Sequence, residues 1–127
     1  MPFLVTYHQE DHLIESRLVG TFDWNVMENM VPEIARLVIE KTCERVLLDF
    51  QAANLNLSTY KIYVTPEKLA AEFQKYNVDI RLLKRALVLA KRDEDFDFLE
   101  TVTLNRQQTM KLFTDPGLAR DWLKRKG

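Results

Sequence analysis

The sequence predicts a single α/β domain over residues 1–127, with a mixed sheet flanked by about four helices. Residues 45–50 and 86–90 carry this prediction, because each has a continuous apolar centre typical of strands covered on both faces. Stretches with helical spacing alternate with these strands, which favours parallel strands joined by right-handed crossovers. The sequence has no internal repeat and no Gly/Ser linker, so we expect one unit.

An N-terminal hairpin is expected to supply the antiparallel part of the sheet. Residues 3–8 are rich in β-branched and aromatic side chains, which favour a strand. Residues 9–11 are polar and suit a turn, and residues 13–19 form a short β-leaning segment that ends at Gly20. The two segments therefore predict a pair of strands that precedes the parallel part.

The first helix is expected to follow Asp23, whose carboxylate can accept hydrogen bonds from the unpaired N–H groups of the first turn. Pro32 lies within this helix and lacks the N–H that the helix requires, so it predicts a kink or a short break. Apolar residues at helical spacing form one stripe along it: Met27, Met30, Val31, Ile34, Leu37 and Val38.

A second helix is expected after residues 45–50, and Ser58 is its candidate N-cap. This helix begins with residues 60–64. Thr65 and Pro66 then interrupt it, and the helical pattern resumes over residues 67–76. The sequence thus predicts a helix in two parts.

The last third of the chain is expected to contain a strand, residues 110–113, with a helix on either side. Acidic residues at 93–97 mark the start of the preceding helix, because negative charge is favourable at the positive end of the helix dipole. Asp115 and Pro116 open the terminal helix, where proline suits the first turn. The expected buried residues are Phe96, Leu99, Val102 and Thr103 in the first of these helices, and Leu118, Ala119, Trp122 and Leu123 in the second.

Composition and charge argue against several function classes. The 18 Lys and Arg residues nearly balance the 19 Asp and Glu residues, so we expect no nucleic-acid partner. A single cysteine, Cys43, excludes an internal disulfide and a cysteine-based zinc site. No apolar run approaches the roughly 20 residues of a membrane span. The first residues do not resemble a signal peptide, so we expect a cytoplasmic protein.

The sequence also lacks the familiar motifs of catalysis. It has no P-loop, nucleophile elbow, dinucleotide fingerprint or HExxH motif. His8 and His12 flank a turn, and we interpret them as exposed turn residues, because a metal site needs three or four convergent ligands. We therefore expect no enzyme activity, no metal and no cofactor.

Aromatic and methionine side chains are dense in the two proline-containing helices: Trp24, Met27, Met30, Tyr60, Tyr63 and Phe73. Adjacent apolar residues within 60–64 cannot all point inward, so some of them face a pocket, a partner or solvent. The set predicts a groove for an apolar small molecule, or a subunit interface such as that of a homodimer. Ordinary core packing is an alternative explanation for most of these residues. Arg106 is expected to satisfy the last carbonyl groups of its helix, or to form a polar pair with Glu100 or with another acid.

Parts of the chain resemble a known group of proteins. Residues 46–49, Val-Leu-Leu-Asp, followed by residues 55–59, Leu-Asn-Leu-Ser-Thr, look like the STAS domain of anti-sigma-factor antagonists. The likeness is closer to the SpoIIAA-like group of small bacterial proteins, which share the STAS/SEC14-type fold, and it covers nearly the whole chain. The residues similar to the C-terminal half of that group are 100–102, 105–106, 113–115, Ala119, Trp122 and Leu123.

This resemblance implies a regulatory role. In STAS antagonists, phosphorylation of a serine at the start of this helix releases a protein partner, and Ser58 matches that serine by position. Leu57 stands where the usual residue is Asp, Tyr60 stands where it is Gly, and capping alone also accounts for Ser58. The resemblance implies a non-catalytic module that contacts a protein partner near Ser58. The SEC14-type relatives imply an alternative, a carrier of a small apolar or amphipathic ligand such as a lipid.

Overall fold

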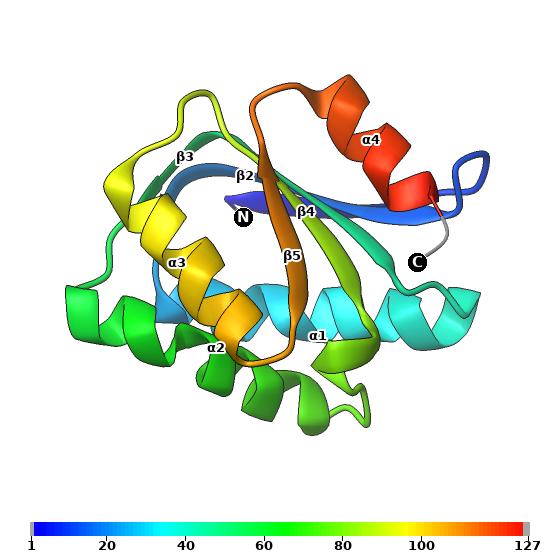
Figure 1. The fold of residues 1–127 in the computed structure, drawn as a ribbon. Helices are drawn as coiled ribbons and strands as arrows, with labels where there is room; N and C mark the ends of the chain where they lie inside the picture. Colours follow the sequence, from blue (N-terminus) through cyan, green and yellow to red (C-terminus); the bar gives the residue numbers. More distant parts are fainter. Residues whose placement is uncertain (1, 126–127) are drawn as a thin grey trace.

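The computed structural model describes residues 2–125 and confirms the predicted α/β class and order of elements (Figure 1). The strands of this part of the chain are β1 (Phe3–His8), β2 (Leu13–Phe22), β3 (Arg45–Leu55), β4 (Lys84–Val88) and β5 (Thr109–Phe113). The α-helices are α1 (Trp24–Lys41), α2 (Thr59–Gln74), α3 (Glu94–Asn105) and α4 (Pro116–Lys124). A short 3-10 helix, η1 (Ile80–Leu82), which the sequence did not predict, leads from α2 into β4.

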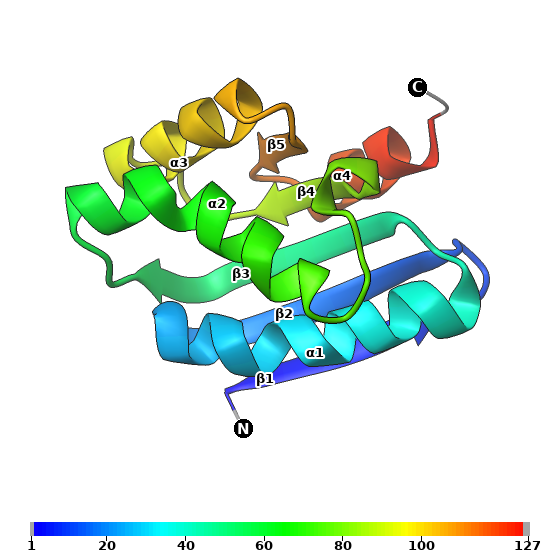
Figure 2. The same ribbon diagram turned by 90° about the horizontal axis from the view of Figure 1, so that it is seen from below.

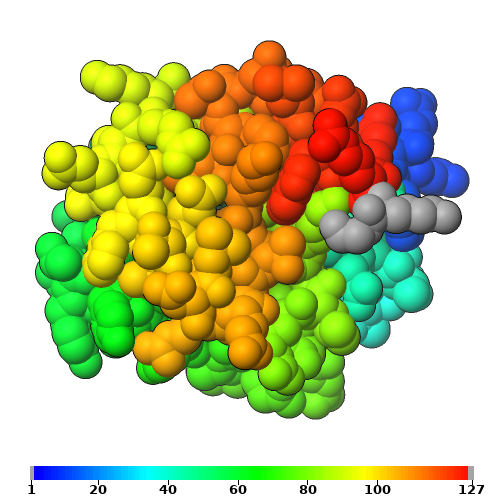
Figure 3. Space-filling model, in the orientation of Figure 1, coloured from blue at the N-terminus to red at the C-terminus, as the bar shows by residue number. Residues whose placement is uncertain are grey.

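The sheet is mixed, and its strands lie side by side in chain order from β1 to β5. β1 pairs antiparallel with β2, and the remaining neighbours are parallel, as predicted. Each crossover steps to the next strand in the same direction, so right-handed connections place α1, α2 and α3 on one face (Figure 2). α4 follows the edge strand β5 and packs on the opposite face, against β3, β4 and β5. In Figure 3 the orange β5 segment reaches the surface between α3 and α4.

Two hydrophobic cores lie on the two faces of the sheet. The larger core, beneath α1, α2 and α3, includes Val46 and Leu87, which are each 1% exposed. The smaller core, beneath α4, includes Leu47 and Leu123, which are 2% and 0% exposed. Successive residues of one strand therefore face different cores, which confirms that β3 and β4 are covered on both faces.

Both proline-containing helices run without the breaks that the sequence predicted. α1 is continuous through Pro32 and α2 through Pro66, so the predicted two-part second helix is wrong. Each proline removes one backbone hydrogen bond from its helix. In α2 the Thr65 hydroxyl donates to the Lys61 carbonyl oxygen at 2.6 Å, and the Pro66 ring is buried, so packing holds the helix together there.

Several boundaries also differ from those predicted. β2 continues past Gly20 to Phe22, because Gly20 adopts a φ of 103°, which is open to glycine, close to a shift in the register with β3. β4 begins at Lys84 rather than at residue 86. Leu118, predicted to face inward from α4, is instead 60% exposed.

Candidate functional site

Three helices begin at the same edge of the sheet, where the parallel strands end (Figure 1). Asp23, Ser58 and Asp93 each accept a hydrogen bond from a backbone N–H of the first turn, at 2.9, 3.2 and 2.9 Å respectively. The caps at Asp23 and Ser58 are those that the sequence predicted. In open α/β sheets, ligands commonly bind outside the carboxyl ends of the strands, which makes this edge a candidate site.

The first turns of α2 expose two aromatic side chains close to Ser58 in the sequence. Tyr60 is 72% exposed, Tyr63 is 50% exposed, and Ser58 is also exposed. Trp24, at the start of α1, is half-buried, and the Nζ atom of Lys61 lies 5.0 Å from the centroid of its ring. We call these five residues the α2-start surface. Exposed tyrosine rings near a hydroxyl, a cation and a half-buried tryptophan are suited to contact with a protein, because tyrosine and tryptophan are enriched at interfaces.

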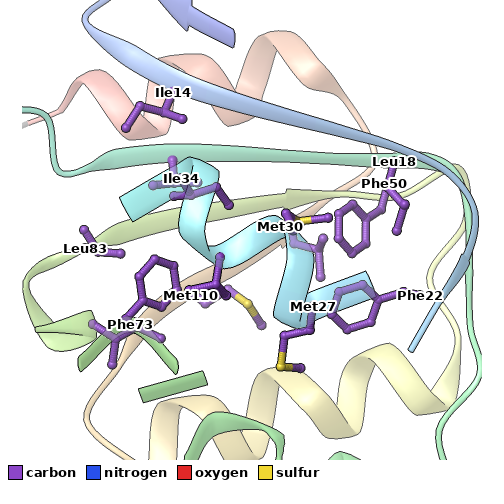
Figure 4. Close-up of a cluster of buried hydrophobic side chains, with 14 of the residues drawn as sticks. Ile14, Leu18, Phe22, Met27, Met30, Ile34, Phe50, Phe73, Leu83 and Met110 are labelled. Carbon is purple, nitrogen blue, oxygen red and sulfur yellow. The ribbon is translucent and has the colours of Figure 1, made fainter. Parts of the chain in front are cut away.

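The other members of the predicted ligand or partner surface lie in the interior. Met27, Met30 and Phe73 are 1%, 4% and 3% exposed, so none of them forms part of an outer surface. They project from α1 and α2 towards the sheet, where they line a cavity of about 50 Å³ (Figure 4). The predicted set therefore divides into an exposed group at the start of α2 and a buried group around this cavity.

The cavity lies between the sheet and α1, α2 and α3, and its wall is almost wholly apolar. Figure 4 shows how α1 and the sheet bring aromatic and methionine side chains together at this place. Among the residues that the structure describes, Arg85 is the one charged residue of the wall. The aromatic and methionine residues of the wall are Phe22, Met27, Met30, Phe50, Phe73, Phe96 and Met110.

Arg85 is a candidate functional residue that the sequence analysis missed. It pairs across the sheet with Val46 and Met110, so its side chain points to the cavity side of β4. Arg85 is 3% exposed, one of its Nη atoms donates to Gln108 Oε1 at 2.7 Å, and its Nε has no hydrogen-bond partner among residues 2–125. Gln108 in turn donates to the Pro66 carbonyl oxygen at 2.9 Å. Burial lowers the pKa of Arg85 to about 10, so the side chain remains charged at neutral pH.

Of the alternatives expected for Arg106, the pair with Glu100 is wrong, and the pair with another acid is confirmed. Glu100 accepts hydrogen bonds from Arg92 at 3.3 Å and from the backbone N–H of Leu112 at 2.8 Å. Arg106 is the C-cap residue of α3 and pairs with Glu67 of α2 instead. Residues three or four apart on a helix face each other, and the spacing between Glu100 and Arg106 is wider than that.

A charged network that the sequence did not predict lies on the other face of the sheet, beside α4. At its centre, Oε1 of Glu15 lies 2.6 Å from His8 Nε2 and accepts from Arg120 at 3.3 Å. Arg120 also donates to Asp11 at 3.0 Å, and the Nζ of Lys124 lies 2.9 Å from the same carboxylate. We call these five residues the α4 clasp. Both carboxylates have cationic partners, so the clasp ties α4 to the β1–β2 hairpin and offers no free acid–base pair.

We expect Asp11→Asn to lower the stability of the folded protein at neutral pH but not in strong acid. The hydrogen bond from Lys124 lowers the pKa of Asp11 below its usual value of 3.8. The stabilisation is therefore complete above that value and is lost as the pH falls through the lower value of the folded state. Thermal unfolding followed by circular dichroism should show a gap in melting temperature between wild type and variant at neutral pH that closes in strong acid. Glu10→Gln in the same turn is the control, and a gap that persists in acid would contradict the expectation.

His12 is exposed in the turn, as predicted, whereas His8 is the last residue of β1 and is half-buried, so the prediction of an exposed turn residue is wrong for His8. The Tyr7 hydroxyl lies 2.6 Å from Nδ1 of His12, and burial raises the pKa of the Cys43 thiol. Among residues 2–125, no group of three or more His, Cys, Asp or Glu side chains is placed to hold a metal ion. None of the helices in these residues is both long and apolar enough to cross a bilayer.

The arrangement of the sheet and helices matches that of a solved protein. The anti-sigma-factor antagonist SpoIIAA, in its unphosphorylated form, matches with a TM-score of 0.58 over 96% of this chain and 97% of the SpoIIAA chain. The chain has the SpoIIAA fold. Because the sequence identity to SpoIIAA is 11%, the match concerns the fold alone. No protein-family model matches the chain, and no curated protein matches its sequence.

Proposed function

We propose that this chain is a non-catalytic regulatory module of the cytoplasm that binds a protein partner through the α2-start surface. The observation that carries the proposal is the exposure of Tyr60 and Tyr63 beside Ser58. Clustered exposed aromatic rings favour contact with a partner, because burying them removes a large apolar area from water. The SpoIIAA fold supports the proposal, since SpoIIAA is an anti-sigma-factor antagonist.

Ser58 is the candidate switch of this surface. Its hydroxyl is exposed at the start of α2, where a phosphate would meet unpaired N–H groups and the positive end of the helix dipole. A phosphate would add roughly −1.5 to −2 charges at neutral pH. Such a charge would lie within the partner contact, where desolvating it is costly. Phosphorylation is therefore proposed to release the partner.

We expect Ser58→Asp to weaken partner binding roughly tenfold or more, which corresponds to about 1.4 kcal/mol. The variant adds a negative charge and keeps the α2 cap, since aspartate caps helices as well as serine does. Ser58→Asn is the matched control, because it has the shape and the capping ability of aspartate without the charge. Immobilised wild type and variants are incubated with a lysate of the source cells, and the retained proteins are quantified by mass spectrometry.

Two outcomes would contradict this proposal. Equal retention by Ser58→Asp and Ser58→Asn would show that charge at Ser58 does not control the contact. Absence of phosphate on Ser58 after incubation with lysate and ATP would remove the switch. Light scattering on the purified chain distinguishes a second copy of the chain from a different partner, because a homodimer forms without any added protein.

A second candidate function, a carrier of a small apolar or amphipathic ligand, is supported by the internal cavity. Its wall of phenylalanine and methionine side chains is typical of ligand pockets, and methionines adapt to the shape of what they contact. The volume of about 50 Å³ exceeds the roughly 10–15 Å³ that one water molecule requires. The cavity also contains Arg85, a charge that an apolar core does not need for its stability.

A further inference from the structure

We infer that the cavity binds an aliphatic carboxylic acid, with the carboxylate paired to Arg85 and the chain among the methionine side chains. This inference rests on the carrier function proposed above and names the class of its ligand. It starts from one observation, a buried cation that lacks an anion. Arg85 is 3% exposed in the wall of the cavity, and no ion pair among the described residues includes it.

The guanidinium of Arg85 has hydrogen-bonding capacity left for a ligand. Gln108 accepts from one Nη, while the Nε–H has no acceptor among residues 2–125. An unpaired buried donor is unfavourable, and a buried charge is normally paired or hydrogen-bonded throughout. A carboxylate can accept these unused hydrogen bonds, because its two oxygens match the geometry of the paired N–H groups of a guanidinium.

The charge and size of the site favour a carboxylate over a phosphate. Arg85 supplies one positive charge, which one carboxylate neutralises, whereas a phosphate ester would leave negative charge in an apolar wall. The cavity of about 50 Å³ is also well below the roughly 150 Å³ of an engineered apolar cavity that binds benzene. The ligand therefore has a small head, and its chain must displace side chains in order to enter.

Three methionines provide the adaptable part of the wall. Met27 and Met30 come from α1 and Met110 from β5, and Figure 4 shows them together between the helix and the sheet. Methionine has three rotatable bonds and no branches, so its side chain can change rotamer at little cost. We assign the aliphatic chain of the ligand to the space that these side chains vacate.

Gln108 marks a route from solvent to Arg85. It lines a surface hollow of about 460 Å³ between α2, η1 and the end of α3, and it also contacts the guanidinium at 2.7 Å. Two ion pairs border the same hollow, Arg81 with Asp79 and Arg106 with Glu67. A carboxylate entering there would reach Arg85 after displacing the amide of Gln108.

Binding of octanoate and of 1-octanol to the full chain tests this inference. The two probes share a chain length and differ in the head, and each is titrated by calorimetry and by NMR of the methionine methyl groups. We expect wild type to bind octanoate at least about tenfold more tightly than 1-octanol, with shifts at Met27, Met30 and Met110. Arg85→Met should abolish the preference for octanoate while still admitting 1-octanol. Arg36→Met removes an equal charge from the exposed side of α1 and should behave as wild type.

The outcomes separate this inference from the carrier function. If wild type binds both probes equally, or if Arg85→Met keeps the preference for octanoate, the role of Arg85 is wrong and the carrier function stands. If neither probe shifts the methionine methyl signals, the carrier function is wrong as well. Arg85→Lys adds a further check, because lysine keeps the positive charge but lacks the paired N–H groups of a guanidinium. This variant should retain only part of the preference for octanoate over 1-octanol.

Discussion

Arg85→Met is expected to raise the free energy of unfolding by about 1–2 kcal/mol, although it removes a fully buried side chain with a hydrogen bond. The guanidinium of Arg85 is desolvated, its Nε has no partner among residues 2–125, and burial lowers its pKa to about 10. Replacing buried charges with apolar residues of similar volume is often neutral, or stabilising by about 1–4 kcal/mol. Methionine has a comparable length and suits a wall that already contains Met27, Met30 and Met110.

One opposing effect reduces the expected gain from Arg85→Met. Gln108 loses the donor of its 2.7 Å hydrogen bond, which costs about 1 kcal/mol, but it keeps its own donation to Pro66. Urea unfolding of the ligand-free chain gives the comparison, with Arg36→Met expected to lie within about 0.5 kcal/mol of wild type. A clear loss of stability in Arg85→Met would mean that the structure satisfies the guanidinium, and the case for a missing anion would fail with it.

Most of the fold could be predicted because it depends on local patterns. The continuous apolar centres at residues 46–48 and 87–89 identified two strands of the parallel part, and Asp23 and Ser58 marked the starts of α1 and α2. Each of these signals lies within a few consecutive residues, because it reflects the burial of one strand or the capping of one helix. The breaks predicted at the prolines were wrong because a proline removes one hydrogen bond, while the packing of a whole helix acts against the break.

The charged contacts were harder to predict, because they join distant parts of the chain. Arg120 of α4 contacts Asp11 and Glu15, which lie in and next to the N-terminal hairpin, and no local pattern links these residues. Glu100 was the named candidate partner of Arg106, yet Arg106 pairs with Glu67 of α2, which only the packing of the two helices brings close. Such pairings follow from the tertiary structure and not from sequence spacing.

The sequence itself contains a signal for the burial of Arg85. The strand was predicted to begin at residue 86, where the continuous apolar run starts. Counting back in steps of two from the buried Leu89 and Leu87 places Arg85 on the same apolar face. A basic residue in phase with the buried face of a strand is therefore a sign of a functional or paired charge.

Gln108→Leu is expected to lower the free energy of unfolding by about 3 kcal/mol, the opposite sign to Arg85→Met. Gln108 is 4% exposed and accepts the hydrogen bond that the Arg85 guanidinium makes within the described residues. Leucine fills a similar volume but accepts nothing, so it leaves a buried charge without a partner, and the Pro66 carbonyl oxygen loses a donor. Gln74→Leu, on α2 at the rim of the same hollow, is exposed and should change stability by less than about 0.5 kcal/mol.

The double variant Arg85→Met/Gln108→Leu decides how these two residues depend on each other. With the charge gone, Gln108→Leu should cost about 1 kcal/mol, since it then removes only the bond to Pro66. The cycle of four proteins should therefore show a coupling of about 2 kcal/mol between the two positions, measured by urea unfolding. Additive effects would mean that Gln108 does not stabilise the charge. In that case the amide would not be the group that an incoming carboxylate replaces, and the route through the hollow would lose its basis.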